Sequence, residues 1–309
     1  MSTFRYLHLD VFAATRGGGN HLGVVLGADA WSAAEMQRFA QWNDLVETTF
    51  LLEPTQPNAS YRVRIFMPDH EVPFAGHPSV GSAHAALKFG VATPVDGLLW
   101  QECAAGVLPI RVEGNGAQRR LLLKNPDAAV LMTGIDAHPG LAAALNGIPL
   151  GKLPPALVAG GRRWWLVEVA NEAAVRAWQP GWSAIGKLAK ATNCLGVCVF
   201  ARSTNPNYQL VVRALAAYHG VTEDPASGAA NGLIAAYIRH AEPDGPLGRG
   251  YVVSQGREVG HDAEMMVRIA DDGIWVGGRV HTILDGTLEW DAPATALAVV
   301  APGTVALRA

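Results

Sequence analysis

Alternating apolar and polar residues along the 309-residue chain predict several β-strands. Segments 7–11, 61–65 and 110–113 each place an apolar residue at every second position. Successive side chains of a strand point to opposite faces of the sheet, so this pattern indicates one buried face and one more polar face. Sheets with a single covered face are commonly antiparallel, and we therefore expect mostly antiparallel strands.

Helical patterns lie between these strands. Ser32 and Glu35 have the spacing of a capping box, which predicts a helix that follows Ser32 and ends near Asn43. Three more helical stretches are predicted at 79–89, at 171–190 with a break at 180–181, and at 226–240. Because helices and strands alternate without a strict βαβ rhythm, the sequence predicts a mixed α/β or α+β fold.

Two segments of the chain resemble each other and indicate an internal repeat. Each has a polar residue and a proline, then small residues that include a glycine, then an apolar stretch: residues 77–87 and 224–234. Because proline has a fixed φ and no N–H, Pro78 and Pro225 are predicted as first helical residues. His77 and Asp224 would then be the N-caps. The segments start 147 residues apart, at 77 and 224, which predicts two related halves; two unrelated turns of similar composition are the alternative.

Small residues at these two turns would leave the backbone open to a ligand. They are Ser79, Gly81 and Ser82 in the first segment and Ala226, Ser227, Gly228 and Ala229 in the second. A helix N-terminus has unpaired N–H groups and about half a positive charge, so two of them facing one cleft would hold a carboxylate. Close packing of the helices explains the same small residues equally well, and the sequence leaves both interpretations open.

Proton transfer also requires a base, and Glu47 is the candidate. It follows the first predicted helix and stands at the entry to an apolar strand. A carboxylate partly removed from water has a raised pKa, which suits it to take and return a proton near neutral pH. Considered alone, a glutamate at the end of a strand is more often a solvated surface residue.

Taken together, these residues resemble the PhzF (phenazine biosynthesis) family. The matching motifs follow one another over nearly the whole chain: Asp10-Val11-Phe12, Gly19-Asn20, Val46-Glu47-Thr48, Pro73-Phe74-Ala75-Gly76-His77-Pro78, Glu223-Asp224-Pro225-Ala226-Ser227-Gly228 and Gln255-Gly256. The resemblance implies the diaminopimelate-epimerase-like fold, with two pseudo-symmetric α+β domains, each a mostly antiparallel sheet around a central helix, and an active site between them. We expect the halves at 1–128 and 129–285, with residues 286–309 returning to the first half.

The resemblance also implies roles for individual residues. Glu47 would be the general acid/base for proton transfer on a small carboxylated substrate, and His77 and Asp224 would orient the substrate or its protons. The expected substrate contacts are Asn20, Gly76, Ser79, Ser227, Gly228 and Ala229. The resemblance implies no metal or organic cofactor. It does imply a homodimer. In the phenazine pathway the family isomerises trans-2,3-dihydro-3-hydroxyanthranilate.

Two positions depart from the phenazine enzymes: Val46 and Ala229 stand where those enzymes carry serine. A missing hydroxyl removes a hydrogen bond to the substrate or along the proton path that is worth about 1 kcal/mol. We therefore expect a substrate other than the phenazine intermediate. The same departures keep a second hypothesis open, namely a small-molecule binding or interaction protein that retains the fold without turnover.

Other constellations favour structural roles. His70, His77 and His84 recur every seven residues, but Pro73 and Pro78 prevent one helix from presenting them on one face, so we expect no metal site. The glycines at 17–19 match no phosphate-loop pattern and predict a flexible turn between strands. Three cysteines are expected to be small core residues, which disfavours the two-cysteine racemases of this fold: Cys103, Cys194 and Cys198.

Composition and charge restrict the expected partners and location. Half of the residues are hydrophobic and the formal net charge is -3, so nothing indicates nucleic acid or an anionic membrane as a partner. The first residues lack the apolar core of a signal peptide, and no stretch approaches the roughly 18 apolar residues of a spanning helix. The cysteines fit no disulfide framework. We expect a cytoplasmic protein that binds a small molecule.

Overall fold

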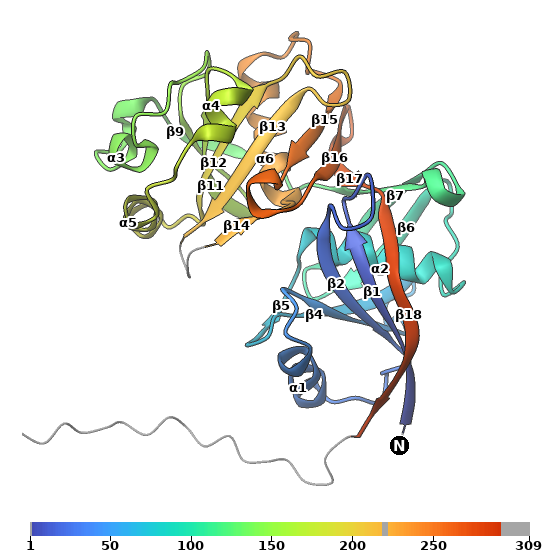
Figure 1. Cartoon of the computed structure of the whole chain (residues 1–309). Coiled ribbons are helices and arrows are strands. Elements are labelled where there is room, and N and C mark those ends of the chain that lie inside the picture. Colours follow the sequence, from blue (N-terminus) through green and yellow to red (C-terminus); the bar gives the residue numbers. More distant parts are fainter. Residues whose placement is uncertain (1, 218–221, 292–309) are drawn as a thin grey trace, which may run out of the picture.

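One continuous series of paired strands runs through both halves of the chain in the computed structural model, which describes residues 2–217 and 222–291 (Figure 1). The first half contains β1 (Ser2–Val11), β2 (Asn20–Leu26), α1 (Ala33–Asn43), β3 (Thr48–Leu52), β4 (Tyr61–Phe66), β5 (Glu71–Val72), α2 (Gly76–Lys88), β6 (Leu98–Cys103), β7 (Gly106–Glu113) and β8 (Arg120–Lys124). The second contains β9 (Ala129–Thr133), α3 (Leu141–Leu145), β10 (Ala156–Gly160), β11 (Arg162–Glu168), α4 (Glu172–Ala177), α5 (Trp182–Thr192), β12 (Gly196–Arg202), β13 (Leu210–Ala216), β14 (Thr222–Asp224), α6 (Gly228–Ala241), β15 (Gly250–Gln255), β16 (Ala263–Ala270), β17 (Gly273–Gly278) and β18 (Val280–Trp290). Short 3₁₀ turns lie at Gly116–Gln118, Ile135–Ala137 and Arg257–Val259.

The two halves repeat the same strand pairings. In the first half β2 is parallel to β3, β3 is antiparallel to β4, and β4 is parallel to β6. In the second half β11, β12, β13 and β15 follow the same pattern. Most other pairs are antiparallel, and β8 pairs with β17 to join the halves. The expected α+β fold with two pseudo-symmetric halves and mostly antiparallel strands is confirmed.

The observed first residues of the two helices change the predicted offset between the two repeated segments. α2 begins at Gly76 and α6 at Gly228, so equivalent helix starts lie 152 residues apart and not 147. The N-caps are Ala75 and Ser227, and His77 and Asp224 are not caps. The prolines misled the alignment because proline is tolerated both in the first helical turn, where Pro78 lies, and before the helix, where Pro225 lies.

Strand β18 returns to the first half, where it pairs antiparallel with β1. The pairing begins at Val280, so the chain crosses back earlier than the expected position 286. Strand β9 starts at Ala129 and pairs with β10, which associates it with the second half. Residues 292–309 of the expected returning segment lie outside the described residues.

The central helices α2 and α6 each lie against the concave side of one sheet (Figure 1). Residues 77–83 of α2 are all buried. Gly81 permits this close packing, because a Cβ there would lie 2.3 Å from Cδ2 of Leu22 and 3.1 Å from Cγ2 of Val11. Gly232 has the same role in α6, where a Cβ would lie 2.1 Å from Oδ1 of Asn125. Close packing therefore explains the small residues inside the helices, although not those at the helix starts.

Replacing Gly81 with alanine is predicted to destabilise the protein by about 1–3 kcal/mol, because the added methyl group overlaps Leu22 in a closely packed core. Gly186 is the matched control, since it also lies in a helix but a Cβ there would approach only the carbonyl oxygen of Ala217, at 3.4 Å. Gly186→Ala should be neutral or stabilising by up to about 1 kcal/mol. Urea unfolding of the two variants measures the difference, and equal changes would contradict the packing argument.

Candidate active site

The first turns of α2 and α6 meet at the junction of the two halves. A Cβ built on Gly76 would lie 3.9 Å from Cα of Gly228, so the two helices begin almost in contact. First-turn N–H groups have no acceptor within their own helix. The Ser227 hydroxyl accepts the N–H of Ala230 at 3.4 Å, and α2 has no side-chain cap. The amides of Gly76, Gly228 and Ala229 are therefore available to an anion.

Glu47 lies beside His77 at this junction. Its Oε2 is 3.3 Å from Nε2 of His77, and the two side chains are 12% and 9% exposed. The Nε2–H of His77 donates to the carbonyl of His21 at 3.1 Å. Oε2 of Glu47 therefore has no hydrogen-bond donor among the described residues, although it is buried. An unpaired buried acceptor is unfavourable in a protein interior, which indicates a position for a ligand.

Burial shifts the pKa of both Glu47 and His77. Burial raises the pKa of Glu47 from its usual 4.5 to about 7, and the positive charge of Arg162 opposes this rise. Burial lowers the pKa of His77 to about 4, so the ring is neutral at pH 7 and its contact with Glu47 is not an ion pair. A carboxyl group with a pKa near 7 exists in both protonation states at neutral pH and can take and return a proton.

Asn20 connects the first half to the second. Its Nδ2 donates to Oδ1 of Asp224 at 3.2 Å and to the carbonyl of Ala226 at 3.5 Å. Oδ1 of Asp224 also accepts the N–H of Ala226 at 3.1 Å, and burial raises the pKa of Asp224. Asn20 is 3% exposed, and its own Oδ1 has no donor in the described part of the chain. The junction thus contains two buried acceptors without donors, one on Asn20 and one on Glu47.

Asp10 builds the turn that presents Asn20. Its carboxylate accepts the N–H of Gly17 at 2.7 Å and the N–H of Gly19 at 2.8 Å. A Cβ at Gly19 would lie 2.1 Å from the carbonyl oxygen of Val11, so only glycine fits there. The glycine-rich segment is a turn between β1 and β2, as the sequence predicted.

Comparison with known proteins agrees with this architecture. The family model PhzC-PhzF, described as phenazine biosynthesis-like protein, matches residues 9–283. The chain belongs to this family. Antisense-enhancing sequence 1 of Schizosaccharomyces pombe is 31% identical over 93% of this chain and 99% of its own length. The trans-2,3-dihydro-3-hydroxyanthranilate isomerase of Pseudomonas aeruginosa is 30% identical over 87% of this chain and 91% of its own. A PhzF-family protein of Bacillus anthracis has the same fold, with a TM-score of 0.79 at 24% identity, over 94% of this chain and 100% of that one.

Most of the predicted site residues lie at the junction between the two halves of this PhzC-PhzF family protein. Glu47 and His77 are in contact, and Asn20 bonds Asp224 across the halves. The remaining members lie at the two helix starts: Gly76, Ser227, Gly228 and Ala229. Of the two departures from the phenazine enzymes, Ala229 lies in the first turn of α6, whereas the side chain of Val46 is 52% exposed.

Ser79, another predicted substrate contact, lies in α2 and has hydrogen-bond partners within the protein. It is fully buried, its hydroxyl donates to the carbonyl of Ala75 at 2.8 Å, and it accepts a hydrogen bond from Nε2 of Gln101 at 2.8 Å. This hydroxyl links α2 to β6 and is satisfied within the protein. The backbone N–H of Ser79 also donates to the carbonyl of Ala75, at 3.2 Å. Contact between Ser79 and a substrate stays a prediction.

The three cysteines and the histidines at 70 and 84 show no sign of a reactive or metal-binding role in the described chain. All three cysteines are buried, and burial raises the pKa of each thiol, which disfavours a reactive thiolate. Nε2 of His84 lies 3.1 Å from the hydroxyl of Thr282, and His70 is exposed. Across residues 2–217 and 222–291, no three metal-ligating side chains are grouped to hold an ion. None of the described helices is long and apolar enough to span a membrane.

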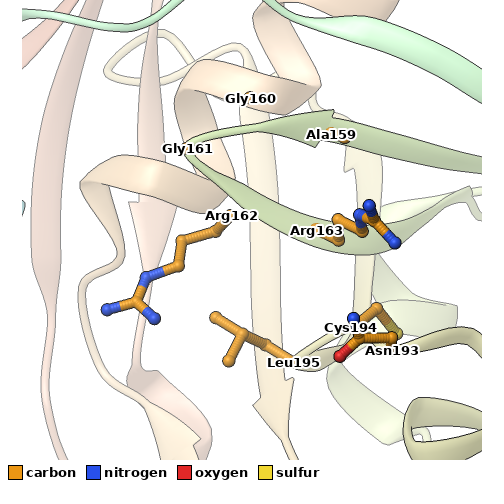
Figure 2. Close-up of a pocket in the computed structure, with 8 residues that line it drawn as sticks. All are labelled: Ala159, Gly160, Gly161, Arg162, Arg163, Asn193, Cys194 and Leu195. Carbon is orange, nitrogen blue, oxygen red and sulfur yellow. The ribbon is translucent and has the colours of Figure 1, made fainter.

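Sequence analysis missed Arg162. This residue starts β11 directly after the turn at 160–161, and it lines a pocket of about 400 Å³ (Figure 2). Its charge acts on Glu47, which lies in the other half of the molecule. No motif marks Arg162, and only the arrangement of the two halves brings its charge within reach of Glu47.

The raised pKa of Glu47 predicts that its ionisation opposes folding. Between pH 4.5 and about 7 the folded protein retains a proton that the unfolded chain has lost, so stability falls as the pH rises through this window. Glu47→Gln, which cannot ionise, should be more stable than the natural protein at pH 8 by about 1–3 kcal/mol and equally stable at pH 4. Urea unfolding at both pH values measures this.

The matched control is Glu53→Gln, because Glu53 follows the same strand but is exposed. It should change stability equally at the two pH values. If Glu47→Gln behaves in the same way, the carboxyl group of Glu47 is not held in its protonated form by burial.

Proposed function

We propose that the protein is a cofactor-independent isomerase that moves a proton along a small carboxylated substrate, with Glu47 as its single general acid/base. The observation that carries this proposal is the buried carboxyl group of Glu47, which has a pKa near 7 and an oxygen without a donor. It lies where two helix N-termini meet. Relatives of similar length that are named isomerases support the reaction class.

The helix starts supply the anion site that this reaction requires. The amides of Gly76, Gly228 and Ala229 would hold the substrate carboxylate between α2 and α6. Removal of a proton from the neighbouring carbon creates enolate-like charge, and donors that are already in position stabilise this charge without reorganisation. His77 and Asp224 would orient the substrate, because the first contacts Glu47 and the second is held by Asn20.

The strand registers favour one base over two. The fourth residue of β2 pairs with Thr48, and the fourth residue of β11 pairs with Val197. Glu47 precedes Thr48, so its counterpart in the second half is Gly196, which precedes Val197. A glycine cannot exchange protons through a side chain. One carboxyl group would therefore remove and return the proton on the same face of the substrate, whereas racemases use two groups on opposite faces.

A binding protein without turnover is the second candidate. Ala229 lies in the first turn of α6 and lacks the hydroxyl of the phenazine enzymes. In addition, the Schizosaccharomyces pombe relative is named antisense-enhancing sequence 1 and not as an isomerase. A binding protein has no chemical need for a buried carboxyl group of raised pKa beside its anion site, which favours the isomerase.

Solvent exchange distinguishes these candidates. The protein is incubated in deuterated water with trans-2,3-dihydro-3-hydroxyanthranilate and a panel of small cyclic amino and hydroxy acids, and NMR detects deuterium beside the carboxylate. Glu47→Gln should lose at least about 100-fold in exchange rate, because a positioned base contributes about this much or more. Glu53→Gln should retain the rate. Ligands that bind the natural protein without exchanging would favour the binding protein, and undiminished exchange by Glu47→Gln would exclude Glu47 as the base.

The exchange reaction should also depend on pH through Glu47. The carboxylate is the form that accepts a proton, so kcat/KM should rise with pH and level off above an apparent pKa near 7. Initial rates between pH 5 and 9 measure this profile. A rise centred near 4.5 would show instead that the base is solvated in the free enzyme.

A further inference from the structure

Arg162 is an exposed cation whose charge acts on Glu47. Among the described residues, no carboxylate forms an ion pair with Arg162 or with its neighbour Arg163. Figure 2 shows the two guanidinium groups pointing away from each other, with that of Arg163 nearer to Asn193 and Cys194. The two arginines are adjacent in β11 and line the same pocket, but only the charge of Arg162 acts on Glu47.

The internal repeat explains why Arg162 lies near the first half. Arg162 is the first residue of β11, and Asn20 is the first residue of the corresponding strand β2. Each forms the last pair of its hairpin, Arg162 with Gly160 and Asn20 with Val11. Asn20 reaches across the junction to the other half, where it bonds Asp224. The equivalent position therefore directs Arg162 toward the first half and Glu47.

The two equivalent side chains differ in whether they have a partner. The amide of Asn20 donates to Asp224 and to the carbonyl of Ala226. The guanidinium group of Arg162 has five N–H donors in a planar fork, and this fork matches the geometry of a carboxylate or a phosphate. No acidic group of the described chain occupies it. A guanidinium group that lines a pocket, has no acidic partner in the described chain and acts on a buried carboxyl group has the chemistry of a ligand contact.

We propose that Arg162 determines specificity by binding a second acidic group of the substrate, a carboxylate or a phosphate, while the first carboxylate lies at the helix starts. This inference rests on the proposed function, since it assumes that the substrate occupies the Glu47 site. It assigns the substrate to the class of small molecules with two anionic groups. The phenazine intermediate has one carboxylate, so a two-anion substrate agrees with the departure at Ala229 from the phenazine enzymes.

Matched ligands and matched variants test this proposal. Benzoate is the probe with one carboxylate, and phthalate, isophthalate and terephthalate are probes with two carboxylates at increasing separation. Phosphonobenzoate isomers distinguish a phosphate-like group from a second carboxylate. NMR titration at low ionic strength in a phosphate-free buffer measures each Kd, because salt screens exposed charges. The proteins are the natural chain, Arg162→Gln and the control Arg163→Gln.

At least one two-anion probe should bind the natural protein and Arg163→Gln about tenfold more tightly than benzoate, which corresponds to about 1.4 kcal/mol. Arg162→Gln should lose this preference while its affinity for benzoate stays within about twofold. An equal preference in all three proteins, or no preference in the natural protein, would overturn the proposal.

The pH profile separates ligand binding from a purely electrostatic effect on Glu47. Since the charge of Arg162 lowers the pKa of Glu47, Arg162→Gln should move the exchange profile to higher pH. A shifted profile with an unchanged preference for two-anion probes would refute the specificity role. A different result would show that the proposed function fails. The preference for two-anion probes would then depend on Arg162, but none of the bound acids would exchange deuterium. Exchange of acids with one carboxylate, with KM unchanged in Arg162→Gln, would refute this inference alone.

Discussion

The close approach of two helix N-termini is the constraint on which the rest of the structure depends. Each central helix is fixed by its own sheet, and the two helices begin so close that a Cβ on Gly76 would lie 3.9 Å from Cα of Gly228. Two positive helix ends repel each other and leave amides unpaired, so this arrangement becomes favourable when an anion lies between them. The pairing of β8 with β17 and the hydrogen bond from Asn20 to Asp224 hold the halves in this position. The backbone alone therefore favours the binding of an anion at this position, independently of the side chains around it.

The two halves share their strand pairings but differ where charge is placed. Glu47 corresponds to Gly196, and Asn20 corresponds to Arg162. One half therefore contributes a buried carboxyl group to the junction, and the other contributes a cation whose charge acts on it. A symmetric scaffold can therefore carry an asymmetric site, because the chemistry depends on a few side chains that the shared strand pairings do not determine.

Local sequence patterns predicted the elements because each depends on neighbouring residues. The capping box at Ser32, for example, is present at the start of α1. Contacts between distant segments were beyond such patterns. The hydroxyl of Ser79 is satisfied by Gln101 on a strand that follows later in the chain, and Arg162 approaches Glu47 only through the arrangement of the two halves. The frame of the repeat failed for a related reason, since a proline marks the beginning of a helix without specifying which residue is first.

Two buried acceptors restrict the kind of ligand that fits the site. Oε2 of Glu47 and Oδ1 of Asn20 both lack a donor in the described chain, and an unpaired buried acceptor costs about 1–3 kcal/mol. A carboxylate bound at the helix starts brings no donor, so it cannot satisfy either atom. In the proposed reaction the carbon-bound proton beside that carboxylate would move to Glu47, whereas Oδ1 of Asn20 would require a hydroxyl or amino group on the same molecule. Within an exchange panel, hydroxy and amino acids therefore fit the junction better than simple carboxylic acids, because they satisfy the anion site and the second acceptor together.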